Sequence, residues 1–159
     1  MDIQLFDFSF PSYSFRIREE KVREIWDIAR KQWVKFTPEE FVRQHAIHFL
    51  HVDLQLPLSL MAVEKSVVFN TMSRRPDLIL FDKQACPFLI AEFKSPEVKL
   101  SRETLEQALR YHSVLGARYL FLSNGHEHAL CQVLPNHQGK WISDANGWKE
   151  VLSNWASIS

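Results

Sequence analysis

Residues 75–81 read Arg-Pro-Asp-Leu-Ile-Leu-Phe, and residues 88–94 read Phe-Leu-Ile-Ala-Glu-Phe-Lys. Both stretches are short apolar runs bounded by polar or proline-containing turns, which is typical of buried β-strands. The first run begins with Asp77. The second ends with Glu92 and Lys94, which lie two residues apart and therefore point to the same face of a strand. If the two strands pair, an acid from each strand lies beside a lysine.

These side chains suit the hydrolysis of a phosphodiester bond with a divalent metal. Carboxylate oxygens such as those of Asp77 and Glu92 are preferred ligands of Mg²⁺, and Mn²⁺ is expected to substitute. The metal polarises the phosphate and lowers the pKa of bound water, while a cation such as Lys94 positions the nucleophile and offsets charge in the transition state. The sequence therefore predicts Asp77, Glu92 and Lys94 as the reacting centre, with the two acids as metal ligands.

A surface ion pair is the alternative interpretation, because a Glu-x-Lys triplet should occur by chance in about one of every two chains of this length. The context of Glu92 argues against it. Four of the five residues from Phe88 to Glu92 are apolar. The acid therefore closes a run that is expected to be buried, where a charge needs a partner or a metal ion.

A second polar pair lies on the segment that follows these strands. Ser101 can cap a helix that reaches Leu115 and ends at Gly116, a residue type common just after a helix C-terminus. Within this helix Gln107 and Tyr111 stand at positions i and i+4 and share one face. Their amide and phenol suit phosphate binding or bracing of the acids, although such a pair alone is more often part of an exposed helix surface.

The remaining pattern indicates a mixed sheet covered by helices. The Thr-Pro-Glu-Glu segment at residues 37–40 forms a capping box and predicts a helix to about Val52. Alternation predicts a strand over residues 13–18, whereas residues 22–28 stay open between helix and strand. The Asn-Gly pair at residues 124–125 predicts a tight hairpin. Further strands are expected over residues 60–69, 77–81, 88–94, 118–123 and 127–134, and a final helix over residues 148–155.

The composition fits one domain over residues 1–159. The chain has 159 residues, 46% of them apolar, which is enough for one core and too few for two ordinary domains. Lys plus Arg equals Asp plus Glu at 19 each, so the summed charge provides no general attraction to nucleic acid. Any DNA contact must come from a local basic patch such as Arg74 and Arg75, although paired arginines at a turn are usually solvated.

Other sequence features exclude several classes of function. Cys86 and Cys131 form no C-x-x-C pair, which favours two buried thiols in a reduced, cytoplasmic protein. No signal peptide or membrane-spanning run is visible, so no membrane contact is expected. The phosphate-binding loop G-x-x-x-x-G-K-[ST] is absent, so no nucleotide cofactor is expected.

The histidines do not predict a metal site. His45, His48 and His51 recur every third residue, but steps of three drift around a helix, so the outer two diverge. No Cys or second histidine cluster accompanies them, which disfavours zinc. His126 and His128 follow the Asn-Gly turn and are expected to be edge residues of the sheet.

Six segments together resemble a known family. They are residues 37–45, 63–65, 75–77, 91–96, 107–111 and 123–125, which include Thr-Pro-Glu-Glu, Arg-Pro-Asp, Ala-Glu-Phe-Lys-Ser-Pro and Ser-Asn-Gly. Over nearly its whole length the chain resembles the N-terminal nuclease domain of type I restriction enzyme R subunits. It is most similar to the short, stand-alone proteins that carry this domain without the motor.

The resemblance implies a PD-(D/E)xK nuclease with a restriction-endonuclease-like fold, an α/β/α core whose mixed sheet is flanked by helices. It implies that Asp77 and Glu92 are the metal ligands and that Lys94 is the catalytic lysine. Gln107 and Tyr111 correspond to the Q-x-x-x-Y element that this family shares with RecB-like exonucleases.

The resemblance also favours a strand over residues 22–28, within an N-terminal extension of about residues 1–36. The family usually has a glycine near the turn before its second site strand, where this chain has Ala-Cys-Pro at residues 85–87. Two acids are candidates for an auxiliary role. The capping box explains Glu40 fully, and Glu64 lies on a strand next to the site.

The first functional hypothesis is therefore a Mg²⁺-dependent DNA hydrolase in which Lys94 orients the attacking water and Gln107 with Tyr111 supports the substrate phosphate. The alternative is a non-catalytic DNA-binding or assembly module of the same fold that acts with a partner protein or as a homo-oligomer. The intact triad favours the enzyme, and the neutral net charge favours the module. The strandedness of the DNA, and endo- against exonuclease cleavage, stay open.

Overall fold

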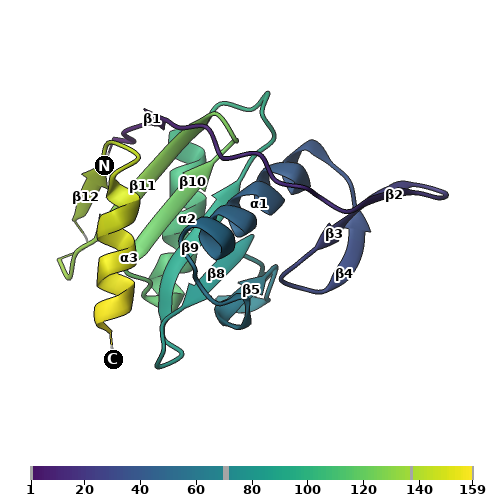
Figure 1. Cartoon of the computed structure of the whole chain (residues 1–159). Coiled ribbons are helices and arrows are strands. Elements are labelled where there is room, and N and C mark those ends of the chain that lie inside the picture. The colour runs from purple at the N-terminus through teal and green to yellow at the C-terminus, as the bar shows by residue number, and fades with distance from the viewer. Residues whose placement is uncertain (1, 70–71, 137, 159) are drawn as a thin grey trace.

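The computed structural model describes residues 2–69, 72–136 and 138–158 (Figure 1). Within these residues seven strands form one mixed sheet, in the order β1-β11-β10-β9-β8-β5 with β12 paired to β11. The strands are β1 (Phe6–Asp7), β5 (Met61–Val63), β8 (Leu78–Phe81), β9 (Pro87–Phe93), β10 (Tyr119–Ser123), β11 (Glu127–Val133) and β12 (Gly139–Ile142). Of these pairs β9–β10 is parallel and the others are antiparallel.

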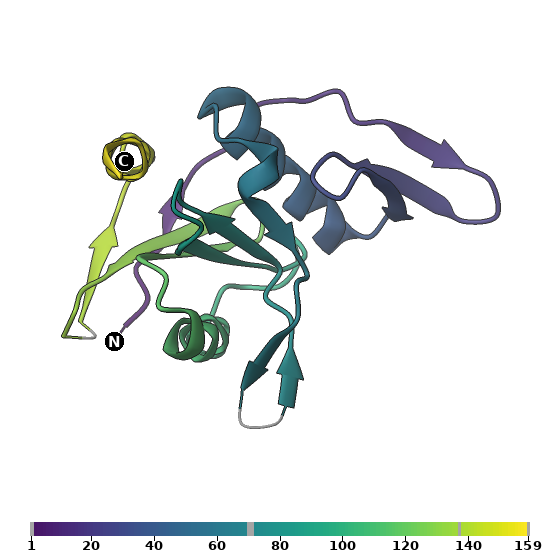
Figure 2. The ribbon, with the colours of Figure 1, turned by 90° about the horizontal axis from the view of Figure 1, so that it is seen from below.

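Helices cover both faces of this sheet (Figure 2). They are α1 (Pro38–His48), α2 (Arg102–Leu115) and α3 (Gly147–Ser157). Helix α2 connects the parallel strands β9 and β10 and shares a core with Ile90 and Leu122. Helices α1 and α3 share the opposite core with Ala91 and Phe121. The predicted fold class, an α/β architecture with a mixed sheet flanked by helices, is confirmed.

A second, smaller sheet lies beside α1 (Figure 2). Its antiparallel strands are β2 (Ile17–Glu19), β3 (Arg23–Asp27) and β4 (Gln32–Lys35). The strand that the family resemblance favours over residues 22–28 is therefore confirmed. The strand predicted over residues 13–18 is wrong for residues 13–16, because β2 begins only at Ile17 and the rings of Tyr13 and Phe15 pack against α1 instead.

The strand predicted over residues 60–69 is interrupted after β5. Glu64 has a φ of 51°, a left-handed conformation that cannot continue an extended strand. Beyond it, β6 (Val67–Phe69) pairs with β7 (Met72–Arg74) in a separate hairpin. The helix predicted to about Val52 is α-helical only to His48 and continues as a π-helical turn over Phe49–Asp53.

Two glycine positions predicted from the sequence are confirmed. Helix α2 ends at Gly116, whose φ of 66° is left-handed. In the turn between β10 and β11, Gly125 has a φ of 93°, and Oδ1 of Asn124 accepts the N–H groups of the next two residues after Gly125 at 3.0 and 2.8 Å. Strand β12 has no counterpart among the predicted elements.

The prediction of two buried thiols is correct for Cys131 and wrong for Cys86. Cys86 is exposed because it lies in the turn between β8 and β9, outside the core. Among the described residues, no helix combines the length and the apolar character that crossing a bilayer requires.

Candidate active site

Asp77 and Glu92 meet at one end of the β8–β9 pair. The register places Leu78 opposite Ala91, so Asp77, which precedes β8, lies beside Glu92. The backbone N–H of Asp77 donates to Oε1 of Glu92 at 3.3 Å, and the N–H of Phe93 donates to Oδ2 of Asp77 at 2.7 Å. Main-chain bonds therefore orient the two acids that the sequence singles out.

Burial raises the pKa of both carboxyl groups. Glu92 is 1% exposed, and burial, followed by the charge of Asp77, raises its pKa to about 8. Burial also raises the pKa of Asp77, while the N–H of Phe93 and the positive charges of Arg43 and Lys94 oppose this shift. Two ionised carboxylates that lie side by side in a low dielectric repel each other. Asp77 and Glu92 are therefore suited to share a cation or a proton.

Lys94 directly follows β9 and stands on the edge where the acids lie. Its backbone N–H donates to the carbonyl oxygen of Ser123 at 2.9 Å, which extends the parallel pairing of β9 with β10 by one residue. Its half-buried ammonium donates to Oε1 of Gln107 on α2 at 3.4 Å. The structure therefore brings the predicted lysine and the predicted amide into contact.

Tyr111 lies one helical turn after Gln107 and holds the turn that precedes Asp77. It is 6% exposed, and its hydroxyl donates to the backbone carbonyl of Arg75 at 3.2 Å. Tyr111 is thus not part of an exposed helix surface. Arg75 is exposed, and the side chain of Arg74 lies outside the described part of the structure.

Arg43 joins Asp77 to the two candidate auxiliary acids, and no local sequence pattern indicates this. Its guanidinium side chain is 4% exposed. It lies 3.5 Å from Oδ1 of Asp77, 3.4 Å from Oε1 of Glu64 and 3.3 Å from Oε2 of Glu40. The contacts with Asp77 and Glu64 span 34 and 21 residues, so only the fold creates them.

Glu40 does more than complete a helix cap. Thr37 caps α1 as predicted, because its Oγ1 accepts the N–H of Glu40 at 3.0 Å. The buried carboxylate of Glu40 accepts from Nε2 of Gln44 at 3.0 Å and from Arg30 at 3.4 Å, in addition to its contact with Arg43. The prediction that capping explains Glu40 fully is therefore wrong.

Arg30 connects this network to the smaller N-terminal sheet. It pairs with the fully buried carboxylate of Asp27, at the end of β3, and lies 3.1 Å from Oε2 of Glu64. Glu39, in the first turn of α1, is half-buried, and burial followed by the charge of Asp77 raises its pKa.

We refer to these groups as the acidic cluster. It contains the six carboxylates of Asp27, Glu39, Glu40, Glu64, Asp77 and Glu92, and the three cations of Arg30, Arg43 and Lys94. Within this cluster the carboxylates outnumber the cations two to one. Partly buried charge of one sign needs a further counter-charge, and either a proton or a metal ion can supply it.

His45, His48, His51 and His128 each bond to a main-chain carbonyl. Nδ1 of His45, His48 and His51 lies 2.8, 2.7 and 2.9 Å from the carbonyls of Phe41, Gln44 and Leu56. His128 is fully buried, and its Nε2 lies 2.7 Å from the carbonyl oxygen of Phe8. The prediction of an edge position is wrong for His128 because β1 covers this side of β11, whereas His126 is exposed.

In the part of the chain that the structure describes, no three His, Cys, Asp or Glu side chains are arranged so that they alone could hold a metal ion. The candidate site is accordingly a two-carboxylate site, Asp77 with Glu92.

The chain belongs to the family described as type I restriction enzyme R protein N terminus (HSDR_N), whose model matches residues 38–144. The predicted family resemblance is thereby confirmed. The matched segment contains Asp77, Glu92, Lys94, Gln107 and Tyr111, and leaves the three-stranded N-terminal sheet outside.

A solved structure with a similar fold comes from Anabaena variabilis ATCC 29413. That protein belongs to DUF820 and has been proposed to be a nuclease. It shares 10% sequence identity with this chain, and the alignment covers 81% of each chain with a TM-score of 0.45. No curated protein shows significant sequence similarity to this chain.

The buried position of Arg43 predicts a large loss of stability for Arg43→Met. Removing one partner of a buried ion pair leaves the other charges uncompensated, which costs about 3–5 kcal/mol. The free energy of unfolding from urea titration at pH 8 checks this. Arg102→Met, which removes a 74% exposed arginine from its pair with Glu106, is the control and should change stability by less than about 1 kcal/mol. Equal effects of the two substitutions would contradict the assigned network.

The raised pKa of Glu92 predicts how the stability of the metal-free protein depends on pH. The folded state holds this proton more tightly than the unfolded chain, so the contribution of Glu92 to stability falls as pH rises from about 4.5 to about 8. In EDTA, Glu92→Gln should raise the melting temperature more at pH 8 than at pH 5. Glu97→Gln, at an exposed position after β9, should leave the profile unchanged. If the melting temperature of Glu92→Gln depends on pH in the same way as that of the wild type, the pKa of Glu92 is not raised in the folded protein.

Proposed function

We propose that this chain is a metal-dependent deoxyribonuclease of the PD-(D/E)xK type. One observation carries the proposal: Asp77 and Glu92 meet from adjacent strands, with Lys94 on the same edge, inside a cluster that has more carboxylates than cations. Membership of the type I restriction enzyme R protein N-terminal family supports DNA as the substrate.

The donor set fits Mg²⁺, with Mn²⁺ as a substitute. Mg²⁺ in proteins is commonly bound by one or two carboxylates, while water and substrate phosphate fill the remaining positions. A pair of carboxylates is therefore enough. Asp77 and Glu92 would hold the ion, and the bound ion supplies a polarised phosphate and a more acidic water molecule.

The other side chains then have distinct roles. Lys94 would place its ammonium beside the attacking water and the phosphate, where a positive charge stabilises the transition state. Gln107 orients Lys94 through their hydrogen bond, and Tyr111 holds the turn before Asp77. Arg43 positions the carboxylate of Asp77 from α1.

The second candidate is a non-catalytic DNA-binding or assembly module that acts with a partner. The zero net charge of the chain favours it, because a DNA enzyme that acts alone usually has a basic surface. Incubation with supercoiled plasmid and with labelled single strands, in Mg²⁺, Mn²⁺ or EDTA, separates the two functions. Metal-dependent cleavage of either substrate supports the nuclease, and binding without cleavage supports the module.

Lys94→Ala should abolish cleavage and leave the fold intact. Losing one such electrostatic group typically lowers kcat by about 10²–10³-fold. The rate of plasmid nicking and a thermal melt test both parts. Lys99→Ala removes an exposed lysine from the following loop and should nick at the wild-type rate. Wild-type cleavage by Lys94→Ala would refute the assigned mechanism.

Asp77→Asn should remove the stabilisation that metal gives. An ion that binds only the folded state stabilises it by about 2.7 kcal/mol at a concentration 100 times its Kd. Millimolar Mn²⁺ should therefore raise the melting temperature of the wild type, and this rise should shrink or vanish in Asp77→Asn.

The matched control is Asp82→Asn. Asp82 is a buried acid at the other end of β8, and its Oδ1 accepts the N–H groups of Gln84 and Cys86, both at 2.9 Å. This substitution should lower stability but keep the full rise with Mn²⁺. An equal rise in Asp77→Asn and wild type would mean that Asp77 is not a ligand, and that Glu92 works with another acid such as Glu40 or Glu64.

A further inference from the structure

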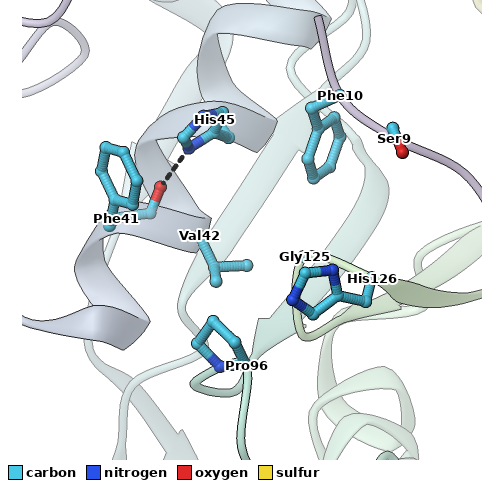
Figure 3. Close-up of a pocket in the computed structure, with 8 residues that line it drawn as sticks. All are labelled: Ser9, Phe10, Phe41, Val42, His45, Pro96, Gly125 and His126. Atoms are coloured by element: carbon cyan, nitrogen blue, oxygen red, sulfur yellow. Dashed lines mark hydrogen bonds between the residues drawn. The ribbon is translucent and has the colours of Figure 1, made fainter. Parts of the chain in front are cut away.

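A cavity lies between α1 and the loops that follow β9 and β10, and none of the roles above uses it (Figure 3). Its volume is about 250 Å³. Sites for drug-sized ligands are typically ~300–1,000 Å³, so this cavity suits a smaller group. It is lined by Ser9, Phe10, Phe41, Val42, His45, Pro96, Gly125 and His126.

We propose that this cavity receives one unpaired nucleobase of the DNA strand whose phosphate lies at Asp77 and Glu92. The inference rests on the proposed nuclease function and adds a substrate class to it: single-stranded DNA, or a duplex end whose terminal base can leave the stack.

The lining selects a planar, neutral and largely apolar group. None of the eight lining residues is Asp, Glu, Lys or Arg, so the cavity has no permanently charged side chain to pair with a phosphate. Three of the lining residues carry rings that lie close together: His45 packs on Phe41 with centroids 4.4 Å apart and is stacked with Phe10 at 6.2 Å (Figure 3). Aromatic rings bind bases of any sequence because every base has a π-face.

Two imidazoles add hydrogen-bonding groups for the edge of a base. Nδ1 of His45 lies 2.8 Å from the carbonyl oxygen of Phe41. A carbonyl can only accept, so Nδ1 carries the hydrogen and the neutral ring keeps Nε2 as an acceptor. The exposed ring of His126 lies across the cavity, on the turn after β10 (Figure 3).

The cavity also lies within reach of the candidate catalytic edge. Pro96 is two residues beyond Lys94, and Phe41 directly follows Glu40 of the acidic cluster. Gly125 and His126 follow β10, the parallel neighbour of β9, so they lie at the same end of the sheet as Glu92. Neighbouring strands are about 4.8 Å apart, so the loop after β10 lies on the order of 10 Å across the sheet from β8, which Asp77 precedes. A short single strand can bridge this span.

Phe41→Leu is the test variant, and Phe15→Leu is its matched control. Both rings are half-buried and pack on His45, with ring centroids at 4.4 and 4.6 Å, but only Phe41 lines the cavity. Binding is measured in Ca²⁺, to prevent turnover, with a 2-aminopurine-labelled single strand and with the blunt duplex made from it.

Phe41→Leu should weaken single-strand binding about tenfold, because stacking of a base on a ring contributes about 1–3 kcal/mol. Duplex binding should change less than about twofold, and Phe15→Leu should change neither. His126→Ala, at an exposed turn position, should also lower single-strand affinity, which keeps the test valid if Phe41→Leu does not fold.

Several results would overturn the inference. Equal losses for Phe41→Leu and Phe15→Leu, or equal losses for single strand and duplex, would mean that the cavity holds no base. Unchanged single-strand affinity in both cavity variants would mean that the cavity does not bind a base and would favour an apolar side chain of a partner protein as its occupant. If the wild type nicks plasmid while these results are obtained, only the base site is wrong. If the wild type neither binds nor cuts DNA, both the base site and the proposed nuclease function are wrong.

Discussion

The register between β8 and β9 is the constraint on which the candidate site depends. Leu78, Ile79 and Leu80 are each at most 1% exposed, so β8 is buried on both faces. A slip of one residue would turn every side chain of the strand to the opposite face. The apolar core therefore fixes Asp77 beside Glu92, and it also removes the water that would stabilise two ionised carboxylates. The same packing creates the site and its electrostatic cost.

The positive charges of Arg43 and Lys94 compensate part of that cost. Arg43 reaches Asp77, Glu40 and Glu64 from α1, and Arg30 joins Glu40 and Glu64 to Asp27 of the smaller sheet. The family match covers residues 38–144 and so includes Arg43 but not Arg30. The N-terminal sheet is thus connected to the site by ion pairs rather than by strand pairing. Loss of this sheet would remove the positive charge of Arg30 from Glu40 and Glu64.

Sequence patterns predicted the features that depend on local periodicity. The two site strands, the helix with Gln107 and Tyr111 on one face, and the Asn-Gly turn each follow from residues close together in the chain. Arg43 was missed because its partner Asp77 lies 34 residues away and the local pattern only marks a helix position. The strand break at Glu64 was missed because it is a left-handed backbone conformation that the alternation of side chains does not reveal. The burial of His128 was missed because β1, which is far from it in the sequence, pairs with β11.

The charge distribution constrains how a DNA strand can approach this edge of the sheet. Glu64, which follows β5, and Glu40 on α1 are each paired with Arg30 and Arg43. The first turn of α1, whose dipole would otherwise attract an anion, already carries Glu39 and Glu40. On the β10 side the cavity next to Pro96 is lined by uncharged residues. A DNA backbone held at Asp77 and Glu92 would meet no charged side chain in the lining of this cavity if it left toward β10 and β11. This is the direction in which the aromatic cavity lies.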